Sequence, residues 1–194
     1  FDGERLDGRG PEEMRDITME VGTLKRADGS AYVEIGNTRV MAAVFGPQEL
    51  HPEHKRKPDR AVLNARYNMA PFSVDDRMRP APSRRDKEIS LVTEKALEPA
   101  VFLEEFPKAE IKVLVEVIED TMVVDVAGEE DAYGKADIPV AMIDADPDRI
   151  TLLQMDGDIP PSDLQEGIEL TQAGNEKLYE MQKETLRETM EVNE

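Results

Sequence analysis

The sequence contains no cysteine, so no disulfide can form and the fold does not depend on an oxidising compartment. It also contains no run of apolar residues long enough to cross a membrane as a helix. The first ten residues, "FDGERLDGRG", lack the apolar core of a secretory signal. These absences lead us to expect a soluble cytoplasmic protein.

Two common nucleotide-binding motifs are also absent: there is no Walker loop and no Gly-rich dinucleotide fingerprint. His51 and His54 are the only histidines, and both lie in one polar loop. A structural zinc ion needs further ligands, usually cysteines, which this loop does not supply. The histidine pair therefore does not predict a zinc site.

The charge is strongly acidic overall, with a formal net charge of -19, which argues against binding a polyanion through the whole surface. However, residues 51–90 hold ten of the 24 Lys and Arg residues and only six of the 43 Asp and Glu residues. Salt confines repulsion from the acidic remainder to roughly 8–10 Å. This basic segment can therefore still bind an anion, while the acidic remainder fits a salt-rich cytoplasm.

Two adjacent arginines follow a helix start signal in "PAPSRRDKEIS". Ser83 and Asp86 have the spacing of a capping box, which places Arg84 and Arg85 in the first helical turn. The helix N-terminus already carries partial positive charge, so two guanidinium groups there favour an anion. The alternative is that the pair is an ordinary surface feature.

Apolar periodicity predicts an α+β fold of one large domain or two small ones. A helix starts after Ser83 and is interrupted at Pro99, and Ser162 caps a second helix that has Leu186 on its buried side. Strands are expected in six stretches, the first of which is a hairpin turning at Gly36-Asn37. These stretches are 30–46, 61–72, 109–118, 123–126, 138–143 and 149–157.

Residues 109–126 form an unusually long β-favouring stretch without Gly, Pro or Asn. A single strand of this length would extend about 60 Å at ~3.3 Å per residue, although strands usually end within ~10 residues. Either Glu119-Asp120 forms a turn, or two strands are joined because residues between them are absent from this sequence.

A second polar constellation follows this stretch, in a loop that carries Glu129, Glu130, Asp131 and Asp137. Crowded carboxylates can bind a metal ion or retain a proton for general acid catalysis. Taken alone, these residues favour a solvated loop of an acidic protein over a functional site.

Five motifs in this order resemble the RNase PH family of phosphorolytic 3′→5′ exoribonucleases, and within it the catalytic subunits of archaeal exosomes. They are "RLDGRGPEEMR" (5–15), "DGSAYVEIGNTRVMAAVFGP" (28–47), "RYNMAPFS" (66–73), "APSRRDKEIS" (81–90) and "EEDAYGKADIPVAM" (129–142). The resemblance runs over almost the whole chain and implies an RNase PH fold, related to the second domain of ribosomal protein S5. It implies one RNase PH-like domain over 1–194, in a family whose members have a further segment where residues 120 and 121 meet here. That segment carries a phosphate-binding loop and a core helix. We expect the protein as made to contain that segment, and an intact mass near 21.8 kDa would contradict this.

The resemblance also implies roles for individual residues. Arg84 and Arg85 correspond to the pair that binds phosphate and the RNA backbone. Asp131 corresponds to the catalytic carboxylate and Asp137 to its companion, and the two are tentative ligands for Mg²⁺. Basic residues of a channel-lining segment correspond to His51, His54, Lys55, Arg56, Lys57, Arg60 and Arg66.

The implied activity is phosphorolysis of single-stranded RNA from its 3′ end, with inorganic phosphate as co-substrate and nucleoside diphosphates as products. The reverse reaction would add RNA tails. The implied assembly is a hexameric ring, a trimer of heterodimers with an inactive RNase PH-like paralogue, under a cap of S1- or KH-type RNA-binding subunits. We expect activity only in the assembled ring. Three alternatives stay open: a non-catalytic RNA-binding ring subunit that lines the channel, an acidic scaffold that binds no RNA, and hydrolysis in place of phosphorolysis.

Overall fold

The structure is a computed structural model of the chain and describes residues 8–10, 13–74, 79–119, 136–144, 146 and 148–192. The chain divides into two compact units. One unit is Thr18–Asp120, and the other combines Phe1–Ile17 with Thr121–Glu194. The mixture of helices and antiparallel and parallel strands confirms the predicted α+β class.

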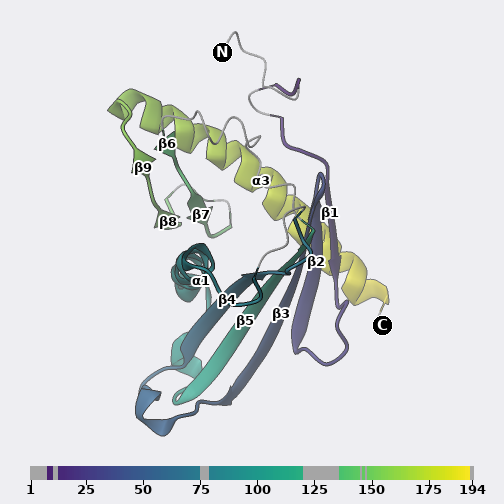
Figure 1. Ribbon diagram of the computed structural model, residues 1–194, viewed down its shortest axis with the longest axis vertical. Coiled ribbons are helices and arrows are strands. Elements are labelled where there is room, and N and C mark those ends of the chain that lie inside the picture. The colour runs from purple at the N-terminus through teal and green to yellow at the C-terminus, as the bar shows by residue number, and fades with distance from the viewer. Residues whose placement is uncertain are drawn as a thin grey trace. The chain divides into compact units, whose positions relative to one another are not determined.

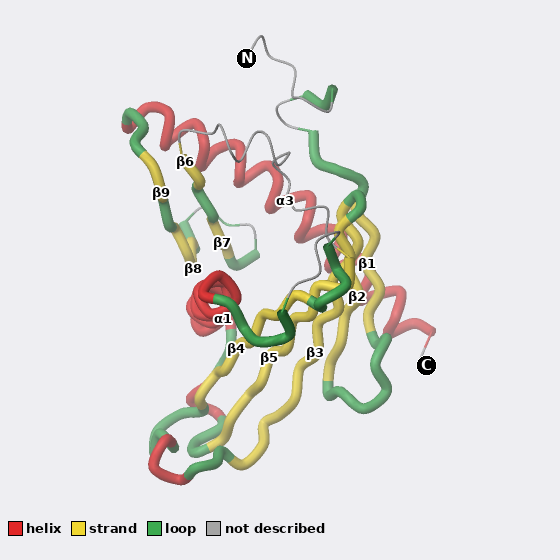
Figure 2. The backbone as a smooth tube through the Cα atoms, viewed as in Figure 1, coloured by secondary structure: helices red, strands yellow, loops and turns green. Residues whose placement is uncertain are grey.

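A five-stranded sheet with the order β1-β2-β3-β5-β4 dominates the first unit (Figures 1 and 2). Its strands are β1 (Ile17–Val21), β2 (Gly29–Ile35), β3 (Thr38–Glu49), β4 (Val62–Met69) and β5 (Ala109–Glu119). The predicted hairpin is confirmed, because β2 pairs antiparallel with β3 and Ile35 lies opposite Thr38 across the Gly36-Asn37 turn. β4 is an edge strand and pairs in parallel with β5.

The connection from β4 to β5 contains the helix α1 (Arg84–Leu97) and three-residue 3₁₀ helices at Glu98–Ala100 and Leu103–Glu105. α1 ends at Leu97, shortly before Pro99, as predicted for a residue that cannot continue the helical hydrogen bonds. A further 3₁₀ helix, Glu53–Lys55, interrupts the loop between β3 and β4.

A cluster of buried apolar residues packs on one face of the sheet in this unit. Ala61, Leu63, Leu103 and Ile111 are buried together, and Leu97 at the end of α1 packs against them. Leu63 lies opposite Ile111 in the parallel register, so alternate residues of β4 and β5 face the same core. Burial of these side chains positions α1 along the β4 edge.

A bulge in β3 allows the backbone of β5 to approach closely. The register with β5 shifts between Phe45 and Gln48, and Gly46 lies at φ 124°. A Cβ atom at Gly46 would lie 2.6 Å from the carbonyl oxygen of Glu110. Only glycine fits this conformation and this space.

The second unit contains two short strand pairs and a long helix. β6 (Ala136–Asp137) pairs with β9 (Asp156–Gly157), and β7 (Val140–Met142) pairs with β8 (Ile150–Leu153). The single strand predicted for 149–157 is therefore wrong: it is two strands with different partners. The break lies at Gln154, whose N–H donates to the carbonyl oxygen of Pro139. The strand predicted for 123–126 lies outside the described residues.

The helix α3 (Pro161–Val192) begins before the predicted cap Ser162, which lies within the first turn. Proline at the first helical position already has the helical φ, and this explains the earlier start. Leu186 is exposed, contrary to its predicted burial. Among the described residues, no helix is both long and apolar enough to span a membrane.

Candidate anion site at the start of α1

A complete capping box fixes the first turn of α1. The Ser83 Oγ accepts a hydrogen bond from the Asp86 N–H at 3.1 Å, and the Asp86 Oδ2 accepts one from the Ser83 N–H at 2.6 Å. Asp86 is only 5% exposed, so its carboxylate is held by this contact. The cap predicted from sequence is confirmed.

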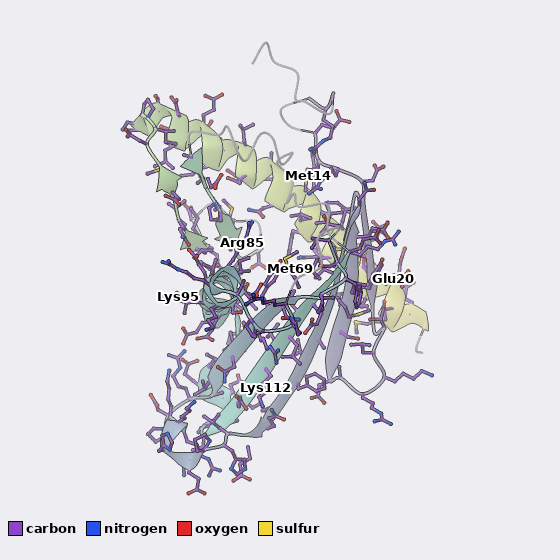
Figure 3. All side chains as sticks on the ribbon, in the orientation of Figure 1. Met14, Glu20, Met69, Arg85, Lys95 and Lys112 are labelled. Carbon is purple, nitrogen blue, oxygen red and sulfur yellow. The ribbon has the colours of Figure 1, made fainter. Side chains whose placement is uncertain are left out.

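Arg84 and Arg85 are the first two residues of α1 and are both exposed. Figure 3 shows Arg85 on this helix. Neither guanidinium forms an ion pair or a hydrogen bond with any residue that the structure describes. Both charges therefore add to the partial positive charge of the helix N-terminus. This combination is suited to binding an anion with several oxygen atoms, such as phosphate.

A serine hydroxyl attaches the start of α1 to the sheet edge. The Ser90 Oγ accepts a hydrogen bond from the Tyr67 N–H at 2.9 Å and donates one to the carbonyl oxygen of Asp86 at 2.5 Å. On its outer side the edge strand β4 has no partner strand among the described residues, and the Tyr67 N–H finds its hydrogen-bond acceptor on the helix instead. This contact holds the first two turns of α1 against the C-terminal half of β4.

An open groove of about 320 Å³ lies between α1 and β4. Its apolar lining comes from Ala65, Tyr67, Pro82 and Leu91. Two cations, Arg66 and Lys87, and two carboxylates, Asp86 and Glu94, also line it. Sequence reasoning did not single out Lys87 or Leu91. Both could have been found from sequence, since they lie three residues before Ser90 and Glu94 respectively, and this spacing places side chains on one face of a helix.

The loop between β3 and β4 contains basic residues that form ion pairs and basic residues that are exposed. Arg56 forms an ion pair with Glu49 at 2.7 Å and donates to the carbonyl oxygen of Leu50, and Arg60 forms an ion pair with Glu98 at 2.9 Å. These two arginines hold the loop in place. The predicted RNA-binding residues of this region thus divide into those two and a set with exposed side chains: His51, His54, Lys55, Lys57 and Arg66.

The Nε2 atom of His51 lies 3.6 Å from the Oε2 atom of Glu49. His54, Lys55 and Lys57 form no side-chain hydrogen bond or ion pair within the described part of the chain. Their side chains are available to a ligand. Whether they bind RNA stays a prediction.

Of the two predicted catalytic carboxylates, Asp131 lies outside the described residues. Asp137 is exposed on β6, directly opposite Asp156 on β9. The described residues contain no group of three or more His, Cys, Asp or Glu side chains that could hold a metal ion. The Mg²⁺ site suggested for Asp131 and Asp137 is therefore still a prediction.

Comparison with known families gives two matches. The model described as "3′ exoribonuclease family, domain 1" matches residues 13–142, and the model of domain 2 of the same family matches residues 113–174. The two matches overlap over residues 113–142, so one stretch of this chain corresponds to parts of both domains.

Curated relatives cover nearly the whole chain. The exosome complex component Rrp41 of Methanopyrus kandleri is 44% identical over 224 residues, covering 96% of this chain and 93% of that protein. Rrp41 of Pyrococcus furiosus is 44% identical over 223 residues, covering 96% and 89%. Both matches are longer than the 194 residues of this chain, so the relatives contain residues without a counterpart here.

Solved structures share the fold at low sequence identity. Rice Rrp46 has a TM-score of 0.80 at 18% identity and covers 94% of this chain and 100% of that chain. A structure titled as the Archaeoglobus fulgidus exosome with RNA bound to the active site has a TM-score of 0.70 at 19% identity, with 92% of each chain covered. These likenesses show the fold alone. The family match over residues 13–142 and the relatives at 44% identity show that the chain belongs to the RNase PH family of 3′ exoribonucleases.

Proposed function

We propose that the chain is a phosphorolytic 3′→5′ exoribonuclease subunit of an exosome ring. It removes nucleotides from the 3′ end of single-stranded RNA as nucleoside diphosphates and, in reverse, extends RNA from them. The observation that carries the proposal is a pair of exposed arginines on the capped first turn of α1, neither of which has an ion-pair or hydrogen-bond partner for its side chain among the residues that the structure describes. In a member of a 3′ exoribonuclease family, that pair has the chemistry needed to hold inorganic phosphate.

In the proposed reaction, Arg84 and Arg85 hold phosphate beside the 3′-terminal linkage. A phosphate oxygen bonds to the phosphorus of that linkage, and the bond from this phosphorus to the 3′ oxygen of the preceding nucleotide breaks. Asp131 gives a proton to the departing oxygen, and Asp137 orients Asp131 or the RNA. The products are an RNA shorter by one nucleotide and a nucleoside diphosphate.

Positioning and charge neutralisation supply most of the rate enhancement in such a step, because the phosphoryl group needs little covalent help from the protein. The guanidinium groups bring two anions, phosphate and the RNA backbone, into contact. Mg²⁺ would further neutralise charge if Asp131 and Asp137 hold it. No step above depends on that metal.

The proposed partners follow from the relatives. The curated relatives are named exosome components, and one solved neighbour is titled as an exosome with RNA at its active site. We infer a ring with an RNase PH-like paralogue, capped by RNA-binding subunits and located in the cytoplasm. RNA passes over the exposed cations of the loop before β4, and the subunit is active only in this ring.

The experiment is to incubate the assembled ring with 5′-labelled single-stranded RNA, with and without inorganic phosphate, and to identify the released nucleotide. Shortening that requires phosphate and releases diphosphates supports the proposal. Asp131→Asn should abolish turnover and preserve RNA binding. RNA binding without shortening would leave the non-catalytic channel subunit, and release of monophosphates without phosphate would show hydrolysis.

A further inference from the structure

We propose that the groove between β4 and α1 is a subsite for one nucleotide of the bound RNA strand. Its base lies against Tyr67 and Leu91, and its phosphate lies between Arg66 and Lys87. This inference takes its ligand, single-stranded RNA, from the proposed function. It goes further because neither the family resemblance nor the capped arginine pair predicts which residues contact a base. Its predictions about RNA binding can be tested separately from catalysis.

The first argument is charge. In a chain with 43 acidic residues, Arg56 and Arg60 are paired with carboxylates, as are Arg39 and Arg149. Arg66 and Lys87 line the groove, and within the described residues neither has an ion-pair or hydrogen-bond partner for its side chain. Two unpaired cations on opposite walls of one groove favour an anionic ligand.

The carboxylates of the groove do not oppose this assignment. Asp86 is buried and its Oδ2 accepts the hydrogen bond of the helix cap. Glu94 lies two helical turns after Lys87, about 10 Å further along α1 at ~1.5 Å per residue. The phosphate is therefore expected at the Lys87 end of the groove, away from Glu94.

The second argument is continuity with the anion site. Lys87 follows Arg84 by three residues on the same helix, so the two residues share one helix face with an axial rise of about 4.5 Å. A strand whose phosphate contacts Arg84 therefore has its neighbouring nucleotide within reach of the groove. The hydrogen bond from Tyr67 to Ser90 keeps the two walls of the groove together at this position.

The third argument is the shape and lining of the groove. Its volume of about 320 Å³ lies in the range of small-molecule sites, and it is open to solvent. Leu91 is 52% exposed there, beside Tyr67 and Pro82. Apolar and aromatic side chains are the surfaces on which single-stranded RNA places its unstacked bases. An apolar lining between two cations thus matches a nucleotide better than it matches free phosphate.

The test measures binding of fluorescently labelled single-stranded RNA to the assembled ring in the absence of phosphate, so that turnover does not interfere. Leu91→Ser should weaken binding roughly tenfold, because a base loses its contact surface. Lys87→Ala should reduce the slope of log affinity against log salt by about 0.7, the value for one phosphate contact in single-stranded nucleic acid. Lys95→Ala, an exposed lysine of α1 outside the groove, is the matched control and should change neither quantity.

A second measurement identifies the base itself. RNAs with one abasic nucleotide at successive positions from the 3′ end are bound to wild type and to Leu91→Ser. One position should weaken binding to wild type and have no further effect on the variant, because the two changes remove the same contact. Additive losses at every position would overturn the inference.

The inference and the proposed function fail in different ways. Normal binding by Leu91→Ser and Lys87→Ala in a ring that still degrades RNA by phosphorolysis would overturn the nucleotide subsite alone. The predicted coupling in a ring without phosphorolysis would support the subsite and overturn the proposed activity. Loss of ring assembly in Leu91→Ser, with unchanged RNA affinity per remaining ring, would show that a partner subunit occupies the groove and would also overturn the inference.

Discussion

The backbone N–H of Tyr67 on the edge strand β4 donates a hydrogen bond to the Ser90 Oγ of α1 at 2.9 Å. This contact joins the sheet to the helix that presents Arg84 and Arg85, and both of its residues line the groove proposed to hold a nucleotide. The stability of the anion site therefore depends on how firmly α1 is held to β4.

Replacing Ser90 by alanine removes this tie. Ser90→Ala leaves a partly buried N–H without its acceptor, and we expect a loss of about 1–3 kcal/mol in the free energy of unfolding. Phosphate affinity should fall as well, because the first turns of α1 lose their position. Chemical denaturation and the phosphate dependence of turnover measure the two effects.

Thr93→Ala is the matched control for this variant. The Thr93 hydroxyl also donates to a carbonyl oxygen of α1, that of Ile89 at 2.8 Å, but no described contact of this hydroxyl reaches β4. It should cost little stability and leave phosphate affinity unchanged. Equal effects of the two variants would contradict the role assigned to the Tyr67–Ser90 bond.

The glycine in the β3 bulge gives a prediction about stability. Gly46→Ala would place a Cβ atom 2.6 Å from the Glu110 carbonyl oxygen at a φ of 124°. We expect a loss of about 2 kcal/mol or more, since both the contact and the backbone conformation become strained. At Gly29, by contrast, a Cβ atom would meet Val44 at an ordinary 3.9 Å. Gly29→Ala should therefore be tolerated, and a similar loss in both variants would contradict this account of the bulge.

Two neighbouring residues test the position of the core. Leu103 is 1% exposed, and Phe102 beside it is 76% exposed. Leu103→Ala should cost about 2–5 kcal/mol because it leaves a cavity next to Ala61 and Leu63. Phe102→Ala should leave the free energy of unfolding nearly unchanged. If thermal or chemical denaturation reversed this order, the assignment of the core would be wrong.

The mass of the protein tests the expected segment between residues 120 and 121. The resemblance predicts a phosphate-binding loop and a core helix there, and the curated relatives align over more residues than this chain contains. We expect mass spectrometry of the purified protein to give a value above 21.8 kDa. A value near 21.8 kDa would mean that this chain lacks the segment, and that the remainder of the phosphate site must come from elsewhere in the ring.

Local features of the fold were predictable from sequence. The capping box joins residues three apart, the β2–β3 turn needs only Gly36-Asn37, and Pro99 ends α1 through its own geometry. Each of these features depends on a few neighbouring residues, so the local sequence is sufficient to predict it. The Ser162 cap was predicted wrongly because Pro161 competes for the helix start one residue earlier.

Long-range contacts were not predictable in the same way. The Tyr67–Ser90 bond and the ion pair between Arg60 and Glu98 join residues far apart in sequence, and their existence depends on how α1 packs on β4. Sequence reasoning therefore treated all the cations of residues 51–66 alike. The groove was missed for the same reason, since its two walls come from different elements.

The central claim is that Arg84 and Arg85 bind the phosphate that attacks RNA. The most direct measurement is the rate of nucleoside diphosphate release from single-stranded RNA against phosphate concentration, for the wild-type ring and for Arg84→Ala, Arg85→Ala and the control Lys95→Ala. We predict that KM for phosphate rises about tenfold or more in each arginine variant, as expected for loss of charge-assisted hydrogen bonds, and stays unchanged in the control. An unchanged KM for phosphate in both arginine variants, or RNA shortening that needs no phosphate, would contradict the claim.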